Sequence, residues 1–126
     1  MNDNFKHRHH HISLKSAFSG IELVIKTELN AKIIIAMGVI VIFFGLLFNI
    51  NYVEWLTVAL TITMVVVSEM INTSIEAVTD LVTNQWHQEA KTAKDVAGGM
   101  VLVASAAAAI IGLIIFLPKF LNLFSI

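Results

Sequence analysis

The chain has 126 residues, of which 57% are hydrophobic and only 13% charged, with a formal net charge of −1 and no cysteine. Soluble domains average about 45–50% apolar and about 25% charged residues, so this composition indicates a single domain that lies in a membrane. The absence of cysteine excludes disulfides, thiolate zinc sites and thiol nucleophiles. Neither the charge balance nor any visible pattern indicates nucleic acid as a partner.

The N-terminal region divides into a polar tail and a segment with helical periodicity. Residues 1–12 include the histidine cluster His7 to His11, and we expect a disordered tail without a metal site there. No signal-peptide pattern is visible, so we expect the chain to insert through its own spans. From residue 13 to about 29 apolar side chains recur at intervals of three and four, with Ser13 as a candidate N-cap. This pattern predicts an amphipathic helix, which lies in the membrane interface or only anchors the chain.

Glu28 interrupts the apolar side of that helix. It follows Leu14 by fourteen residues and Ile21 by seven, which at about 3.6 residues per turn places it among apolar side chains. A carboxylate in such a position needs a cation, a metal ion or a proton as its partner. The other interpretation is that Glu28 marks a kink before the first membrane span.

Three apolar segments follow, and they predict three transmembrane helices over about 31–49, 53–82 and 93–117. The apolar parts of the first two fall a little short of the roughly 20 residues that cross a bilayer, so each helix must include a polar shoulder. We expect Pro118 to stop the third span. That span contains GGMVLVASAAAAIIG, and such small residues let helices approach closely in lipid. Because three helices bury little by themselves, we expect a homo-oligomer with this small-residue face at or near its core.

The basic residues predict how the chain is oriented. All lysines and arginines except Lys119 lie before the apolar part of the first span, which begins at Ile33, or between the apolar parts of the second and third, which end at Val67 and begin at Val96. The loop between the first two spans has none. The positive-inside rule therefore places the N-terminus and the acid-rich end of the second span on the cytoplasmic side.

Three carboxylates lie at that end of the second span, in the stretch SEMINTSIEAVTD. Asn72, Thr73, Glu76 and Asp80 follow Glu69 by three, four, seven and eleven residues, so all five share one narrow stripe of a helix. A helix that simply leaves the membrane would explain Asp80 but not Glu69, which has valines and an isoleucine around it. An ionisable group at such depth usually serves a function.

The stripe and the loop after it contain the components of phosphoryl transfer. An apolar setting makes Glu69 hold a proton more readily, which suits a general base. Glu76 and Asp80 offer the oxygen ligands that Mg²⁺ prefers, and Lys91 and Lys94 can meet phosphate. Neither a P-loop nor a G-x-G-x-x-G motif is present, so a nucleotide site would be of an unusual kind. Two other interpretations stay open: a small multidrug or ion transporter subunit, in which a buried glutamate couples to protons, and a non-catalytic membrane scaffold.

The stretches EMINTSIEAVTD and HQEAKTAKD together resemble the small integral-membrane lipid kinases of bacteria, the diacylglycerol kinase and undecaprenol kinase family. That family has approximately the pattern E-x-x-N-[ST]-[AS]-I-E-x-x-x-D, followed by H-x-x-A-K-x-A-K-D. The chain is similar to this pattern from Glu69 to Asp80 and from His87 to Asp95, and more weakly from about Ser13 to Lys119. The stretch ELN, Glu28 to Asn30, resembles the family's E-x-N element before its first span.

The resemblance implies an all-α homotrimer in the bacterial cytoplasmic membrane, with three transmembrane helices and one surface helix per subunit. It implies ATP with Mg²⁺, a membrane lipid alcohol as acceptor, and active sites between subunits at the cytoplasmic interface. Glu69 is then the general base, and Glu28 and Glu76 hold the metal. The lipid substrate is expected at Glu69, Ser16 and Gly20. ATP is expected to contact Glu28, Asn72, Glu76, Asp80, Gln85, Trp86, His87, Lys94 and Asp95.

Some positions depart from the family's pattern and bear on the substrate. Ser16 and Ser19 are small where family members often carry aromatic or basic residues, and Ile33 stands where a histidine is frequent. The stretch TELNAKII differs from the NEAAFRQE of diacylglycerol-preferring members, and IIGLIIFLPK looks more like the Gram-positive undecaprenol kinases. The resemblance therefore implies transfer of the γ-phosphate of ATP to undecaprenol, with diacylglycerol as the alternative acceptor.

Overall fold

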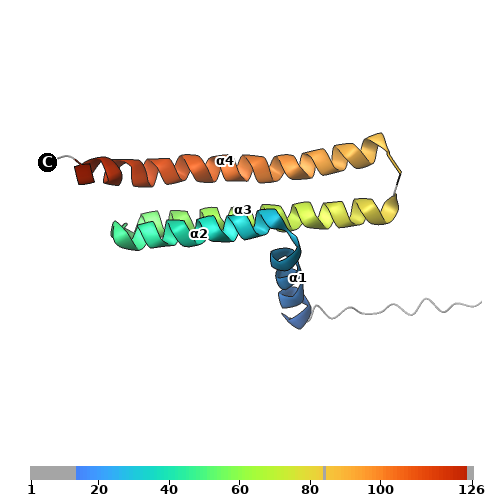
Figure 1. Ribbon diagram of the computed structural model, residues 1–126, viewed down its shortest axis with the longest axis horizontal. Helices are drawn as coiled ribbons and strands as arrows, with labels where there is room; N and C mark the ends of the chain where they lie inside the picture. Colours follow the sequence, from blue (N-terminus) through green and yellow to red (C-terminus); the bar gives the residue numbers. More distant parts are fainter. Residues whose placement is uncertain (1–13, 84, 125–126) are drawn as a thin grey trace, which may run out of the picture.

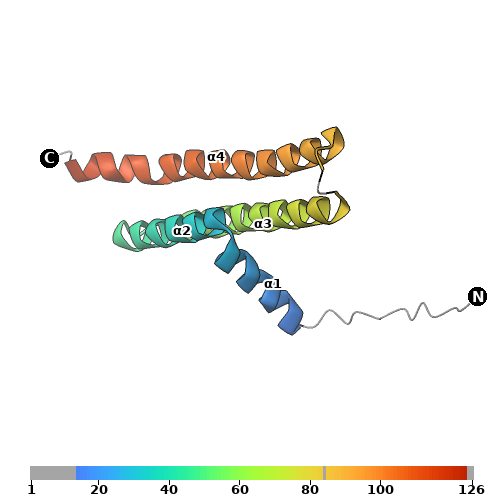
Figure 2. The ribbon, with the colours of Figure 1, turned by 45° about the vertical axis from the view of Figure 1, so that its right-hand side comes forward.

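The structure is all-helical (Figure 1). The computed structural model describes residues 14–83 and 85–124, and that part of the chain forms four helices: α1 (Leu14–Thr27), α2 (Leu29–Leu47), α3 (Tyr52–Val82) and α4 (Gln88–Phe124). The last three run along a common direction, with α3 in contact with both others, and α1 projects from them at a steep angle (Figures 1 and 2). The predicted tail, its histidine cluster and the predicted cap Ser13 lie outside the described residues.

Three of these helices are long and apolar enough to cross a membrane: α2, α3 and the Gln88–Leu123 part of α4. Many of their large apolar side chains are exposed, as expected for helices surrounded by lipid. With a rise of about 1.5 Å per residue, the 31 residues of α3 extend roughly 46 Å, which exceeds the ~30 Å apolar core of a bilayer. Accordingly, the C-terminal half of α3 reaches beyond the junction of α1 and α2 in Figure 1. The expectation of three helices able to span a membrane is confirmed.

A tight turn joins α2 to α3, and the sequence FNINY accounts for it. Asn49 has a φ of 45°, in the left-handed region that asparagine tolerates better than most residues. Asn51 is the N-cap of α3, and its side-chain oxygen accepts a hydrogen bond from the Glu54 backbone N–H at 3.0 Å. The Glu54 carboxylate in turn accepts from the Asn51 backbone N–H at 2.7 Å, which completes a capping box. The turn and the start of α3 are therefore specified by local chemistry.

Apolar packing gathers at this same end of the molecule. A buried cluster consists of Ile50, Val58 and Ile115. The Phe120 ring of α4 meets the rings of Phe44 and Phe48 of α2 edge to face, with centroids 5.5 Å and 4.8 Å apart. Such aromatic pairs contribute about 0.5–1.5 kcal/mol each beyond the area they bury, so they tie the end of α4 to α2.

The prediction that Pro118 ends the third span is wrong, because α4 continues to Phe124. Proline removes one N–H donor from a helix, but helices in membrane bundles tolerate it where neighbouring contacts compensate. Here the turn after the proline is held by tertiary contacts. Lys119 Nζ lies 3.1 Å from Glu54 Oε1 of α3, and Phe120 packs on the rings of α2.

Small residues of α4 form part of its contact with α3, which is the most extensive contact between helices. Ala97 and Ala104 are both buried within the chain. Short side chains let the two backbones approach closely, as expected from the sequence. The homo-oligomer predicted from the same segment stays a prediction.

Gly45 allows α2 to approach the start of α3 closely, because it has no side chain. A Cβ atom at this position would lie 2.8 Å from Trp55 Cη2 and 3.1 Å from Ile50 Cδ1. We therefore expect Gly45→Ala to lower the free energy of unfolding by about 1–3 kcal/mol, because the indole must move. Gly38→Ala is the matched control, since its Cβ would meet Ile62 at an ordinary 3.6 Å and should leave stability unchanged or raised. Equal unfolding midpoints of the two variants in detergent micelles would contradict this packing.

Candidate active site

Glu69 is enclosed where α1, α2 and α3 meet. Its side chain is 1% exposed, and neither carboxylate oxygen has a hydrogen-bond partner among the described residues. Burial of a carboxyl group without a partner costs free energy, so this residue works against the stability of the fold. The predicted burial of Glu69 is confirmed. Its two unpaired acceptor oxygens are available to a ligand that can donate a hydrogen bond.

A break between α1 and α2 brings Glu28 to this place. Glu28 has an extended backbone, with φ −89° and ψ 124°, and is the N-cap of α2. Its carboxylate and that of Glu76 act electrostatically on Glu69, and the Asn30 side chain also lies close to Glu69. Glu28 therefore marks the kink before the first span that the sequence offered as one interpretation, and its carboxylate lies near enough to act on Glu69. A metal ion or proton as its partner stays a prediction.

The predicted stripe on α3 runs from the interior to the surface. Glu69 and Asn72 are buried, Glu76 is half-buried and Asp80 is exposed. Asn72 Nδ2 donates to Glu76 Oε1 at 3.0 Å, which leaves Asn72 Oδ1 buried and without a partner among the described residues. The Thr73 hydroxyl donates to the Glu69 backbone carbonyl at 3.0 Å, so it serves the helix rather than the carboxylate. Three buried oxygen acceptors thus stay unpaired within two turns of helix.

An ion pair connects the outer end of the stripe to α4. Lys94 Nζ lies 2.5 Å from Asp80 Oδ1, although the two residues belong to different helices. Lys91 Nζ lies 2.5 Å from Asp95 Oδ2, one turn further along α4. Each lysine therefore has a carboxylate partner. We had not predicted either pair from the sequence.

The remaining predicted nucleotide-binding residues lie in the loop between α3 and α4. Gln85, Trp86 and His87 are all exposed there. The Gln85 backbone N–H donates to Thr83 Oγ1 at 3.1 Å, and His87 Nδ1 lies 3.6 Å from Glu89 Oε2. These side chains are close in sequence to the outer end of the stripe but do not approach Glu69 in the contacts that the structure describes.

A cavity of about 170 Å³ opens beside Glu69, between α1, α2 and α3. Ser16 is exposed and Gly20 half-buried on α1, and neither of these predicted lipid contacts lines it. The apolar residues that line this cavity were not identified from the sequence, although the spacing of apolar side chains in α1 indicated that Ile21, Val24 and Ile25 share one face of that helix. Apart from Glu69, every lining side chain is apolar: Ile21, Val24, Ile25, Ala31, Ile34, Ile35, Val66 and Met70.

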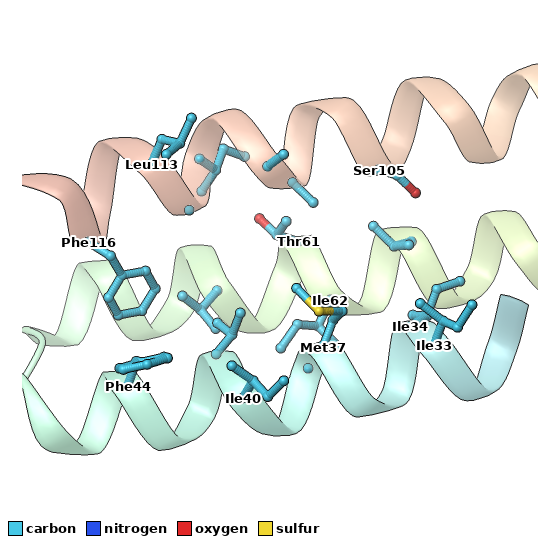
Figure 3. A pocket seen from close by; sticks show the side chains of 18 of the residues that line it. Ile33, Ile34, Met37, Ile40, Phe44, Thr61, Ile62, Ser105, Leu113 and Phe116 are labelled. Carbon is cyan, nitrogen blue, oxygen red and sulfur yellow. The ribbon is translucent and has the colours of Figure 1, made fainter.

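A larger groove of about 670 Å³ lies between α2, α3 and α4 (Figure 3). Phe44 and Phe116 lie towards one end of it, and Ile33 and Ser105 towards the other. Its lining side chains include no acid and no base, so it offers no chemistry of its own. The candidate site therefore lies at the smaller cavity, which Glu69 lines.

Comparison with known proteins decides the family. The sequence profile of the prokaryotic diacylglycerol kinases matches residues 15–116, a range that includes every residue of the candidate site. The chain belongs to this family of lipid kinases. It is 39% identical over 107 residues to the undecaprenol kinase of Bacillus subtilis, covering 85% of this chain and 87% of that protein. It is also 37% identical over 113 residues to the diacylglycerol kinase of a Synechocystis species, covering 89% of this chain and 65% of that protein.

Membership confirms the resemblance that the motifs of α3 and α4 indicated, and with it the expectation of a kinase. The transporter and scaffold interpretations lose their basis, since neither is an activity of this family. The roles expected for individual residues stay predictions.

Replacement of the buried acid should make the protein more stable. Met has a similar length to Glu but no polar group that requires a partner, so Glu69→Met should raise the free energy of unfolding by about 1–3 kcal/mol. Glu22→Met is the control, because Glu22 is exposed and the change should stay within about 0.5 kcal/mol. Thermal unfolding in micelles measures both. A destabilised Glu69→Met variant would mean that the carboxylate has a stabilising partner.

The ion pair between α3 and α4 should matter little for stability. Both side chains are well exposed, at 38% and 63%, and exposed pairs contribute at most about 1 kcal/mol. We therefore expect Asp80→Asn to leave the unfolding midpoint close to that of the unchanged protein. Glu22→Gln, which breaks the exposed pair with Lys26 inside α1, provides the scale for comparison. Loss of folded protein in Asp80→Asn would show that this pair holds the two helices together.

Proposed function

We propose that this protein transfers the γ-phosphate of ATP to the hydroxyl of undecaprenol at the cytoplasmic face of the bacterial membrane. The observation that carries the proposal is the buried, unpaired carboxylate of Glu69 in an apolar cavity, next to two further acids. The choice of undecaprenol is supported by the similarity to an undecaprenol kinase along most of both chains.

Glu69 acts as the general base in this proposal. The lipid hydroxyl donates to a Glu69 oxygen, and its proton moves there as the hydroxyl oxygen attacks the γ-phosphorus. The bond from that phosphorus to the bridging oxygen breaks, and ADP leaves. The apolar walls exclude water, which would otherwise compete with the lipid as acceptor.

Mg²⁺ fits the acids that surround Glu69. Among the described residues no group of three or more His, Cys, Asp or Glu side chains is arranged as a complete metal site. Mg²⁺ seldom uses such a cage, since it takes one or two carboxylates together with phosphate oxygens and water. Glu28 and Glu76 would supply the carboxylates, and Asn72 Oδ1, which has no partner among the described residues, lies between Glu69 and Glu76 along the stripe of α3. The ion neutralises charge on the phosphate groups when it is bound.

ATP approaches from the cytoplasmic end of α3. Lys94 exchanges its partner Asp80 for a phosphate oxygen, while Asp80, Asp95 and the loop side chains Gln85, Trp86 and His87 contact the rest of the nucleotide. The exposure of the loop and of the Lys94–Asp80 pair supports this exchange, because neither ion has to be withdrawn from an apolar interior.

The proposal includes a homotrimer with its N-terminus in the cytoplasm and α1 in the membrane interface, where Ser16 and Gly20 border the lipid. The distribution of basic residues supports this orientation. The apolar groove between α2, α3 and α4 supports association with further copies, because Ala108, Ala109 and Gly112 leave room there for a close-packed helix.

Diacylglycerol is the second candidate acceptor. The family bears the name of that activity, and the Synechocystis relative is called a diacylglycerol kinase. Both alcohols are membrane lipids with a primary hydroxyl, so the same base and nucleotide site would serve either one.

One assay tests the proposal and the substrate together. The purified protein in micelles receives labelled ATP, Mg²⁺ and either undecaprenol or a diacylglycerol. We expect phosphorylation of undecaprenol at the higher rate. Absence of transfer to both alcohols, in protein that is folded, would refute the kinase proposal, and a faster reaction with diacylglycerol would reassign the acceptor.

The role of Glu69 has its own test. Glu69→Gln keeps the size of the side chain but cannot accept the proton, so kcat should fall by about 10²–10⁴-fold while ATP still binds. Turnover and equilibrium binding of a labelled nucleotide measure the two effects separately. Glu22→Gln, on the exposed face of α1, should change neither. Persistent turnover in Glu69→Gln would remove the residue from the role of base.

A further inference from the structure

We propose that the cavity beside Glu69 discriminates between lipid alcohols by chemistry, accepting a polyprenyl alcohol and rejecting a diacylglycerol because its walls offer an ester no hydrogen-bond donor. The inference rests on the proposed function, in which the acceptor hydroxyl reaches Glu69. It goes beyond that function by assigning the selectivity to wall residues of α1 and α2.

The two alcohols differ in the atoms next to the hydroxyl. In a polyprenol the carbinol carbon is followed only by hydrocarbon, with a double bond and a methyl branch. In a 1,2-diacylglycerol the next carbon already bears an ester oxygen, and a second ester follows one carbon later. Whatever surrounds Glu69 must therefore accommodate hydrocarbon in the first case and two polar ester groups in the second.

The walls of the cavity match the first case. Ile21 and Ile25 contribute from α1, Ile34 and Ile35 from α2, and Glu69 carries the only polar side-chain atoms among the lining residues. An ester carbonyl that enters such a space loses its hydrogen bonds to water and finds no donor among the side chains that line the cavity. Sites that leave a polar group unpaired in this way disfavour the ligand by about tenfold or more per group.

The size and opening of the cavity agree with a single hydrocarbon chain. Its volume of about 170 Å³ is below the ~300–1,000 Å³ of pockets that enclose whole drug-sized ligands, so it holds only the hydroxyl end of a lipid. Ile21, Ile25 and Ile35 are 40%, 40% and 39% exposed, so the wall that they form also faces the surroundings of the chain. One chain can leave past these side chains into the bilayer, whereas the two chains of a diacylglycerol, which diverge at the second carbon, would have to share this small space.

The test introduces a donor into the wall without changing its shape. Thr and Val have nearly the same shape and differ by a hydroxyl in place of a methyl group, so Ile25→Thr is compared with Ile25→Val and Ile35→Thr with Ile35→Val. The full chain in micelles is assayed with undecaprenol, a dioleoylglycerol and a dialkylglycerol, which has two chains but ether links instead of esters. Two positions are used, both partly exposed, so that a folding defect at one leaves the other informative.

The expected result is a change in selectivity. The ratio of kcat/KM for the dioleoylglycerol to that for undecaprenol should be roughly threefold or more higher in each Thr variant than in its Val partner, since a new hydroxyl can donate to the ester. The dialkylglycerol should change less, and the unchanged protein should use it better than the ester.

Three results would overturn the inference. Equal ratios in the Thr and Val variants, or a preference of the unchanged protein for the dioleoylglycerol, would show that the wall does not select against esters. Equal ratios with continued preference for undecaprenol would leave the proposed function intact, whereas a preference for the dioleoylglycerol would also reassign the acceptor. No phosphorylation of any alcohol by the unchanged protein would refute the proposed function and this inference together.

Discussion

A carboxylate enclosed by apolar side chains is the constraint around which the end of this molecule that contains α1 is arranged. Glu69 is buried, its oxygens lack partners among the described residues, and it lies in a helix that can span a membrane. An ionisable group in such a segment usually serves a function, since lipid offers it no hydrogen-bond partner. α1 and α2 enclose it from two sides, and the break at Glu28 supplies a second acid at its edge.

The opposite end of the bundle provides the stability that this site lacks. There the capping box of α3, the close approach at Gly45, and the aromatic contacts between α2 and α4 are all well paired or well packed. The Glu54–Lys119 pair joins α3 to the end of α4 at the same level. One end of the molecule is thus tightly packed, whereas the other end contains buried polar groups without partners among the described residues. Enzymes often retain reactive groups in this way at a cost to stability.

Much of this arrangement could be predicted from the sequence, because it depends on local periodicity. The spacing of Glu69, Glu76 and Asp80 predicted one stripe, and the observed order from buried to exposed follows from the direction in which the helix leaves the apolar segment. The prediction that Pro118 ends the third span was wrong because contacts between helices, not local periodicity, decide where α4 ends. A proline is a local signal to stop, but contacts of the next two residues with other helices outweigh it, and no local pattern encodes those contacts. The partner of Lys94, Asp80, was equally invisible, since that pair joins different helices.

By itself the sequence determined the three apolar helices, their acidic stripe and, through its motifs, the family. These features follow from helix geometry and from the exclusion of polar groups by lipid, which act on residues a few positions apart. Only the tertiary structure decided that Glu28 lies near Glu69 and that Glu69 lines a small cavity with isoleucine walls. Those facts depend on the angle at which the chain leaves α1 for α2 and on how three helices pack. Such an angle is set by the sum of many distant contacts, so no short stretch of sequence contains it.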